Sequence, residues 1–182
     1  MTDTILSLGP LVRVEGRWLL GDPGRAGGGA WVEFGEDGMR AHARDSSTES
    51  IPWSRIMMGM GVTIGARLPG KAGSTVGLLG MFAGLPGPLR GRRGGYLHMT
   101  VRHPYEDRLV FFDRHPWWYP IGELAFLQAL LSHLVDEGEL HRLADTAWLD
   151  RTITRVLPVN STTTRARLQE MASEATGAGR AG

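Results

Sequence analysis

Residues 65–72, Gly-Ala-Arg-Leu-Pro-Gly-Lys-Ala, come closest to a catalytic motif because they nearly match a phosphate-binding loop. In that motif a Ser or Thr hydroxyl after the lysine holds magnesium, but here the position is Ala72. A nucleotide hydrolase also needs alternating strands and helices, which this chain does not predict. We therefore expect no nucleotide site, and we interpret Asp113, a conceivable metal-holding residue, as the end of a hairpin strand.

Three histidines, His98, His103 and His115, are close enough in the sequence to suggest a metal site. His103 precedes a turn and His115 follows the far end of the returning strand, so an ordinary hairpin separates them by most of a strand length. We therefore expect surface or half-buried histidines and no metal site. The chain also has no Gly-x-Ser-x-Gly element and its carboxylates are scattered, so we expect neither a catalytic residue nor a cofactor.

Residues 65–95 differ in composition from the rest of the chain. Ten of these 31 residues are glycine, five are basic and none is acidic, and the middle, residues 76–85, is apolar. A connection this long inside a domain is functional, disordered or a sign of a missed element, and the composition leaves these three readings open. Cationic ends around an apolar centre suit a loop that binds a protein groove or dips into an anionic membrane.

A second candidate binding element is Trp117-Trp118-Tyr119, the densest aromatic cluster, which lies between two prolines. We expect an exposed contact for a partner here, with at least one ring covering the core where the following helix docks. Residues 90–95 contain a single Arg-Gly tract without interleaved aromatics, so nucleic acid is not expected as a partner. The candidate binding residues are Arg67, Lys71, Phe82, Arg90, Arg92, Arg93, Trp117, Trp118 and Tyr119.

The composition indicates one domain with its own core, since the chain has 182 residues of which 42% are hydrophobic. There is no cysteine, which excludes disulfides and cysteine-bound zinc and favours the cytoplasm. The sequence shows no secretory signal and no apolar stretch of about 20 residues, so no transmembrane segment is expected. Of the 20 basic residues only Lys71 is lysine, a bias that we attribute to a GC-rich bacterial genome.

The elements that must position these candidates are predicted strands followed by predicted helices. We expect strands over residues 11–20, 30–35, 39–44 and 51–67, connected by a glycine-rich stretch at 21–29, an Asp-Gly turn and a polar turn at 45–50. Residues 96–101 and 108–112 predict a further hairpin. A helix is predicted over residues 121–135, a second helical pattern from Leu140 is stopped by Pro158, and residues 158–182 are expected to be a flexible tail.

This order resembles bacterial pleckstrin-homology-like and GRAM-like domains over roughly residues 10–136. The resemblance rests on the closing hairpin and helix and on Ile51, Trp53 and Ile56, whose apolar and aromatic spacing matches a short strand of these domains. It implies an α+β fold of mostly antiparallel strands, a split barrel closed by a C-terminal amphipathic helix, in one domain of residues 1–157. The inositol phosphate site of the family needs basic residues on the first hairpin, where this chain has only Arg25, so that ligand is not expected.

The sequence thus predicts a cytoplasmic, non-catalytic binding or scaffold module that engages a protein partner through residues 65–95 and the aromatic residues 117–119. One alternative is peripheral binding to an anionic membrane through the same segment. Another is a barrel that holds a small ligand, as a binding protein or as an enzyme. A homodimer formed at the exposed strand edge near Pro52 also remains open.

Overall fold

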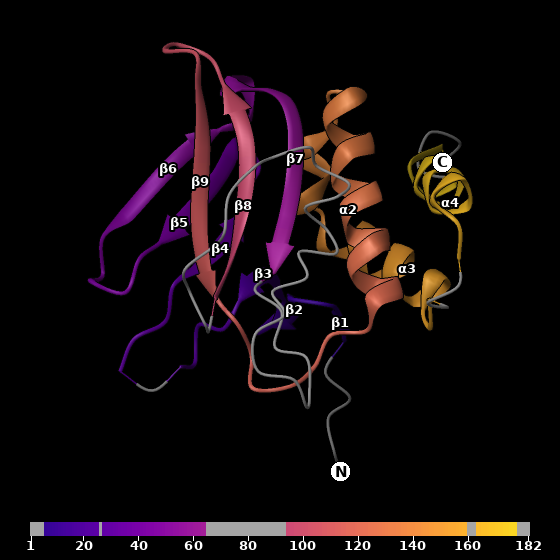
Figure 1. The fold of residues 1–182 in the computed structure, drawn as a ribbon, viewed down its shortest axis with the longest axis horizontal. Coiled ribbons are helices and arrows are strands. Elements are labelled where there is room, and N and C mark those ends of the chain that lie inside the picture. Colours follow the sequence, from indigo (N-terminus) through magenta and orange to yellow (C-terminus); the bar gives the residue numbers. More distant parts are fainter. Residues whose placement is uncertain (1–5, 26, 65–93, 160–162, 178–182) are drawn as a thin grey trace, which may run out of the picture.

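Two antiparallel sheets precede the helices along the chain (Figure 1). The computed structural model describes residues 6–25, 27–64, 94–159 and 163–177. The first sheet has the strand order β1-β2-β3-β4-β5-β6 and the second has the order β7-β8-β9. Among the described residues these strands form two antiparallel sheets, which together with the helices confirm the expected α+β fold of mostly antiparallel strands. The same residues form no closed barrel, so the split barrel stays a prediction.

The first sheet consists of β1 (Ser7–Leu8), β2 (Leu11–Val14), β3 (Arg17–Gly21), β4 (Trp31–Phe34), β5 (Gly38–His42) and β6 (Thr48–Pro52). The second consists of β7 (Ile56–Ile64), β8 (Gly94–Val101) and β9 (Glu106–Asp113). The helices are α2 (Ile121–Asp136), α3 (Thr146–Val156) and α4 (Arg165–Gly177), with short 3₁₀ helices η1 (Trp53–Arg55) and η2 (Leu140–Ala144). The predicted hairpins β4–β5 and β8–β9 are confirmed, and β8 buries alternate residues as a pleated strand with one covered face does.

The predicted strand over residues 11–20 is wrong because the chain reverses in its middle. Glu15 and Gly16 have φ values of 47° and 80°, and Val14 pairs with Arg17. Two consecutive residues with positive φ make a two-residue hairpin turn whose twist suits antiparallel strands. The segment is therefore the hairpin β2–β3.

The polar turn expected at residues 45–50 is shorter than predicted, since β6 already begins at Thr48. The strand expected over 51–67 is interrupted by η1, where the indole N–H of Trp53 donates a hydrogen bond to the carbonyl of Gly35 at 2.9 Å. Pro52 ends β6, which is the edge strand of its sheet, so the predicted edge position of this proline is confirmed.

Helix α2 confirms the helix predicted over residues 121–135, and it lies beside the free edge of β7 (Figure 1). Its apolar face is buried and includes Phe126, Leu127, Leu130, Leu131 and Leu134. The side-chain amide of Gln128 accepts from the N–H of Val62 at 2.8 Å and donates to the carbonyl of Met60 at 3.3 Å. One side chain thus satisfies two of the β7 edge groups that a further strand would otherwise bond.

The C-terminal region differs from its prediction in two ways. The helical pattern that starts at Leu140 divides into η2 and α3, because Asp145 caps α3 by accepting a hydrogen bond from the N–H of Trp148 at 2.9 Å. The tail expected from residue 158 contains α4, in which Leu168 and Ala172 are buried. Its polar composition gave no sign of a helix in the sequence, because this helix is stabilised by packing against α2. In these described ranges no helix is both long and apolar enough to cross a membrane.

Candidate functional site

Antiparallel strand reversals bring several loops to one end of the molecule, which we call the loop end (Figure 1). It comprises residues 22–25, 27–30, 43–47 and 114–120 together with the end of β7 and the start of β8. Trp117, Trp118 and Tyr119 lie here. The other six candidates, Arg67, Lys71, Phe82, Arg90, Arg92 and Arg93, lie outside the described residues. The residues that flank their segment, Ile64 and Gly94, are at the loop end.

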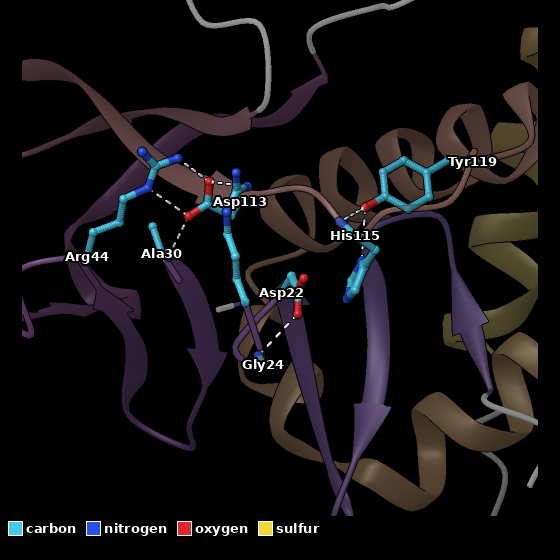
Figure 2. Close-up of polar contacts among 8 residues, drawn as sticks. Asp22, Gly24, Ala30, Arg44, Asp113, His115 and Tyr119 are labelled. Atoms are coloured by element: carbon cyan, nitrogen blue, oxygen red, sulfur yellow. Dashed lines mark hydrogen bonds and ion pairs between the residues drawn. The ribbon is translucent and has the colours of Figure 1, made fainter. Parts of the chain in front are cut away.

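The carboxylate of Asp113, at the end of β9, is the most highly connected polar group of the loop end (Figure 2). It is only 1% exposed. Oδ1 accepts from Arg25 Nη1 at 3.0 Å, and Oδ2 accepts from Arg44 Nε at 2.8 Å and from the N–H of Ala30 at 2.9 Å. Arg44 also donates through Nη2 to Oδ1, so its guanidinium forms a bidentate pair with both carboxylate oxygens.

The backbone of Asp113 joins the two sheets at the same point. Its N–H donates to the carbonyl of Ala30 at 2.7 Å, and its carbonyl accepts from the N–H of Asp22 at 3.0 Å. Gly21 has a φ of +96°, and a Cβ there would lie 2.9 Å from the Cβ of Phe112. Only glycine therefore allows β3 to approach β9 this closely.

Electrostatics keeps Asp113 ionised. Burial alone would raise its pKa, but the hydrogen bonds from Arg44 and Ala30 and the charges of Arg25 and Arg44 together lower the pKa below its ordinary value. Both oxygens are occupied by protein donors. The carboxylate therefore acts as a joint between sheets, and it has no free lone pair directed at a substrate.

A second polar cluster lies just after β9, where His115 and Tyr119 are both buried (Figure 2). The Tyr119 hydroxyl accepts from the backbone N–H of His115 at 2.9 Å and lies 2.9 Å from His115 Nδ1. The hydroxyl can donate its proton to Nδ1 while its oxygen accepts from the backbone N–H, and this arrangement requires the His115 tautomer that is protonated on Nε2. Burial lowers the pKa of His115 and raises that of Tyr119, so both are neutral at pH 7.

Two large aromatic side chains project from this cluster into solvent. Trp117 is 41% exposed and stacks on the His115 ring with centroids 4.3 Å apart. Trp118 is 58% exposed, and the guanidinium of Arg114 lies 5.8 Å from its ring centroid. Ile121, at the start of α2, is 60% exposed. Tyr119 is only 8% exposed, while the two tryptophans form an exposed apolar surface.

The histidines that are close in sequence are spread over the structure. His98 lies on β8, where burial lowers its pKa, and His103 is in the turn at the opposite end from the loop end. His115 is more deeply buried than the expected surface or half-buried position. In the ranges that the structure describes, no group of three or more histidine, aspartate and glutamate side chains could hold a metal ion.

Sequence reasoning missed the Asp113 joint because its parts are far apart in the chain. Arg44 and Arg25 lie 69 and 88 residues from Asp113. The available signals were an acidic residue ending an otherwise apolar strand and a lone arginine among the glycines of residues 21–29. Neither signal identifies the residue with which it pairs, because the pairing depends on how the two sheets meet. When the chain was compared with protein-family models, curated proteins and solved structures, no match was found.

Proposed function

We propose that this chain is a non-catalytic binding module that engages a protein partner through the loop end. The observation that carries the proposal is the pair of exposed tryptophans, Trp117 and Trp118, on a loop whose neighbouring residues are buried and hydrogen-bonded. Tryptophan is the residue type most often found to dominate binding energy at protein interfaces. Exposed tryptophans have no role in the core, so contact with a partner accounts for them better than folding does.

Preorganisation supports the same proposal. Trp117 stacks on a buried His115, and Tyr119 is fixed by two contacts to the same histidine. Pro116 and Pro120 restrict the backbone on both sides. A loop that is already ordered loses little conformational entropy on binding, which leaves more of the contact energy for affinity.

The candidate residues of the 65–93 segment are part of the proposal because the segment leaves and re-enters the described chain at the loop end. Five basic residues without an acidic one favour a partner whose surface is acidic around an apolar pocket. The architecture we propose is pleckstrin-homology-like. The order of two antiparallel sheets followed by a helix at the edge of β7 supports it.

The test compares Trp118→Ala with Tyr105→Ala, a matched change of an exposed aromatic residue. Tyr105 is 70% exposed but lies in the turn between β8 and β9, at the other end of the strands. Each variant and the unchanged chain would be used for affinity capture from native lysate with quantitative mass spectrometry, and for sedimentation with anionic and neutral vesicles. We expect Trp118→Ala to lower capture of a specific protein at least about tenfold and Tyr105→Ala to leave it unchanged.

Two outcomes would contradict the proposal. Equal capture by both variants would remove the tryptophans from the binding surface. Loss of binding to anionic vesicles in Trp118→Ala, without loss of any protein, would instead assign the loop end to a membrane surface.

A further inference from the structure

Three side chains of other elements form hydrogen bonds with the last turn of helix α4. The indole N–H of Trp148 donates to the carbonyl of Ala175 at 3.3 Å, and Arg142 Nη1 donates to the carbonyl of Thr176 at 3.0 Å. His133 Nε2 lies 2.7 Å from the Thr176 hydroxyl. These three side chains, which we call the C-terminal clamp, come from three different elements, α2, η2 and α3.

The His133 contact joins a ring nitrogen to a hydroxyl. When the Thr176 hydroxyl donates its proton within its own helix, to the carbonyl of Ser173 at 2.9 Å or of Ala172 at 3.3 Å, its oxygen accepts from His133 Nε2. The clamp thus contacts two backbone carbonyls and one hydroxyl at the end of α4, where a helix has unpaired carbonyls and a negative partial charge.

The helix itself is poorly suited to exist alone. Its first turn has no acidic residue and its last turn has no basic residue, which is the reverse of what the helix dipole favours. Arg165 and Arg167 instead lie near the positive end and Glu174 near the negative end. At 13 residues, the helix also lies in the range where isolated helices are marginal in water.

The apolar contact of α4 with the rest of the molecule is smaller than that of α2, although Leu168 and Ala172 belong to the core and Met171 packs against it partly buried. The buried residues of α4 are Leu168, Ala172, Ala175 and Thr176, a single large apolar side chain among them. By contrast, α2, which lies between β7 and α4 in Figure 1, buries Phe126 and four leucines. The clamp therefore contributes a larger share of the docking of α4 than polar contacts contribute to that of α2.

From these observations we propose that residues 163–177 form a conditional C-terminal strap. The strap is helical while the C-terminal clamp holds its carbonyls, and it undocks and melts as a unit while both sheets and α2 stay folded. Release uncovers Trp148 and the side of α2 that α4 packs against. This inference is independent of the proposed function, since it concerns a different face of the molecule.

Hydrogen exchange of the full chain, followed by mass spectrometry, tests the strap directly. In the unchanged protein we expect the amides of α4 to exchange at least about a hundredfold faster than the slowest amides of α2, because the strap opens without global unfolding. Equal protection of α4 and α2 would overturn the proposal, because α4 would then open only when the whole molecule unfolds.

Substitutions test whether the C-terminal clamp controls the rate of hydrogen exchange in α4. Arg142→Ala should speed exchange in α4 about tenfold and leave the β8 and β9 amides unchanged. The matched control is Arg151→Ala, since Arg151 is exposed on α3 and should change neither region. Faster exchange throughout the molecule in Arg142→Ala, or none in α4, would contradict the assignment of the clamp.

A stabilising variant keeps the test informative if Arg142→Ala folds poorly. Ala166 is exposed in the first turn of α4, so Ala166→Glu places a negative charge at the positive end of the helix dipole. We expect exchange of α4 to slow about two- to fivefold, with no change in α2. An unchanged rate in α4 would show that the intrinsic stability of this helix does not limit its docking.

Discussion

The Asp113 joint and the C-terminal clamp use the same chemistry in two regions of the molecule. In both, arginine holds an oxygen atom of a distant element, over 69 and 88 residues for Asp113 and over 34 residues for Thr176. The backbone of Asp113 is also hydrogen-bonded to Asp22 and Ala30, and apolar residues of β9 are buried beside it. The clamp acts on a helix with one large buried side chain. We therefore expect a polar contact to fix an element more firmly where backbone pairing and apolar burial support it.

Among the variants that test this comparison, the one that removes the Asp113 carboxylate should lower the free energy of unfolding most. Asp113→Ala leaves the N–H of Ala30 without its side-chain acceptor and two arginines without their partner. We expect the free energy of unfolding in urea to fall by about 2–3 kcal/mol, below the usual cost of breaking a buried pair because Arg44 reaches solvent. Arg142→Ala should cost less than about 1 kcal/mol in the same measurement, since the strap is not part of the global unit. Equal losses in the two variants would remove the distinction between joint and clamp.

Acid should weaken the joint selectively. The pKa of folded Asp113 lies below its ordinary value of 3.8, so the unfolded chain binds the proton first as the pH falls. The contribution of this residue to stability is therefore complete above pH 3.8 and is lost as the pH drops through the lower pKa of the folded state. Asp113→Asn cannot titrate there. We expect the stability difference between the unchanged chain and Asp113→Asn to shrink below pH 3.8 in urea titrations, and a constant difference would contradict this.

A substitution in the loop after β9 should have an intermediate effect on the free energy of unfolding. Tyr119→Phe keeps the buried ring but leaves the N–H and Nδ1 of His115 without the hydroxyl. Leaving buried polar groups unpaired costs about 1–2 kcal/mol, which urea unfolding would detect. Tyr105→Phe is the control, because Tyr105 is exposed and its loss of a hydroxyl should be neutral. A neutral result for Tyr119→Phe would show that water replaces the hydroxyl and that the loop is less ordered than its contacts indicate.

Local patterns in the sequence predicted those parts of the fold that depend on neighbouring residues. The β8–β9 hairpin and α2 follow from alternation and helical spacing, and both are confirmed. The Glu15-Gly16 turn was missed because the apolar run around it resembles one continuous strand. Helix α4 was missed for the opposite reason, since its polar sequence becomes helical through contacts with residues up to 43 positions away.

The candidate site was predictable only in part. The aromatic cluster of residues 117–119 was visible as composition, and the division between a buried Tyr119 and two exposed tryptophans needed the structure. The ionic joint at Asp113 requires knowledge of how the two sheets meet, which no local pattern contains. Long-range polar pairs are the features that a single sequence specifies least clearly, because any of many arginines could be the partner.

Trp118→Ala should have the smallest effect on the free energy of unfolding, and this result would show that Trp118 at the loop end is available for binding and is not needed for folding. Trp118 is more than half exposed and stacks with the guanidinium of Arg114, so Trp118→Ala should change the free energy of unfolding by less than about 0.5 kcal/mol. Tyr119→Phe, at the neighbouring position in the chain, removes only a hydroxyl but should lower the free energy of unfolding several times more. Two adjacent aromatic residues would then have opposite roles, one stabilising the loop and one available to a partner. A loss for Trp118→Ala as large as that for Tyr119→Phe would mean that Trp118 is part of the folded core of the loop, and the exposed surface assigned to partner binding would shrink to Trp117 and Ile121.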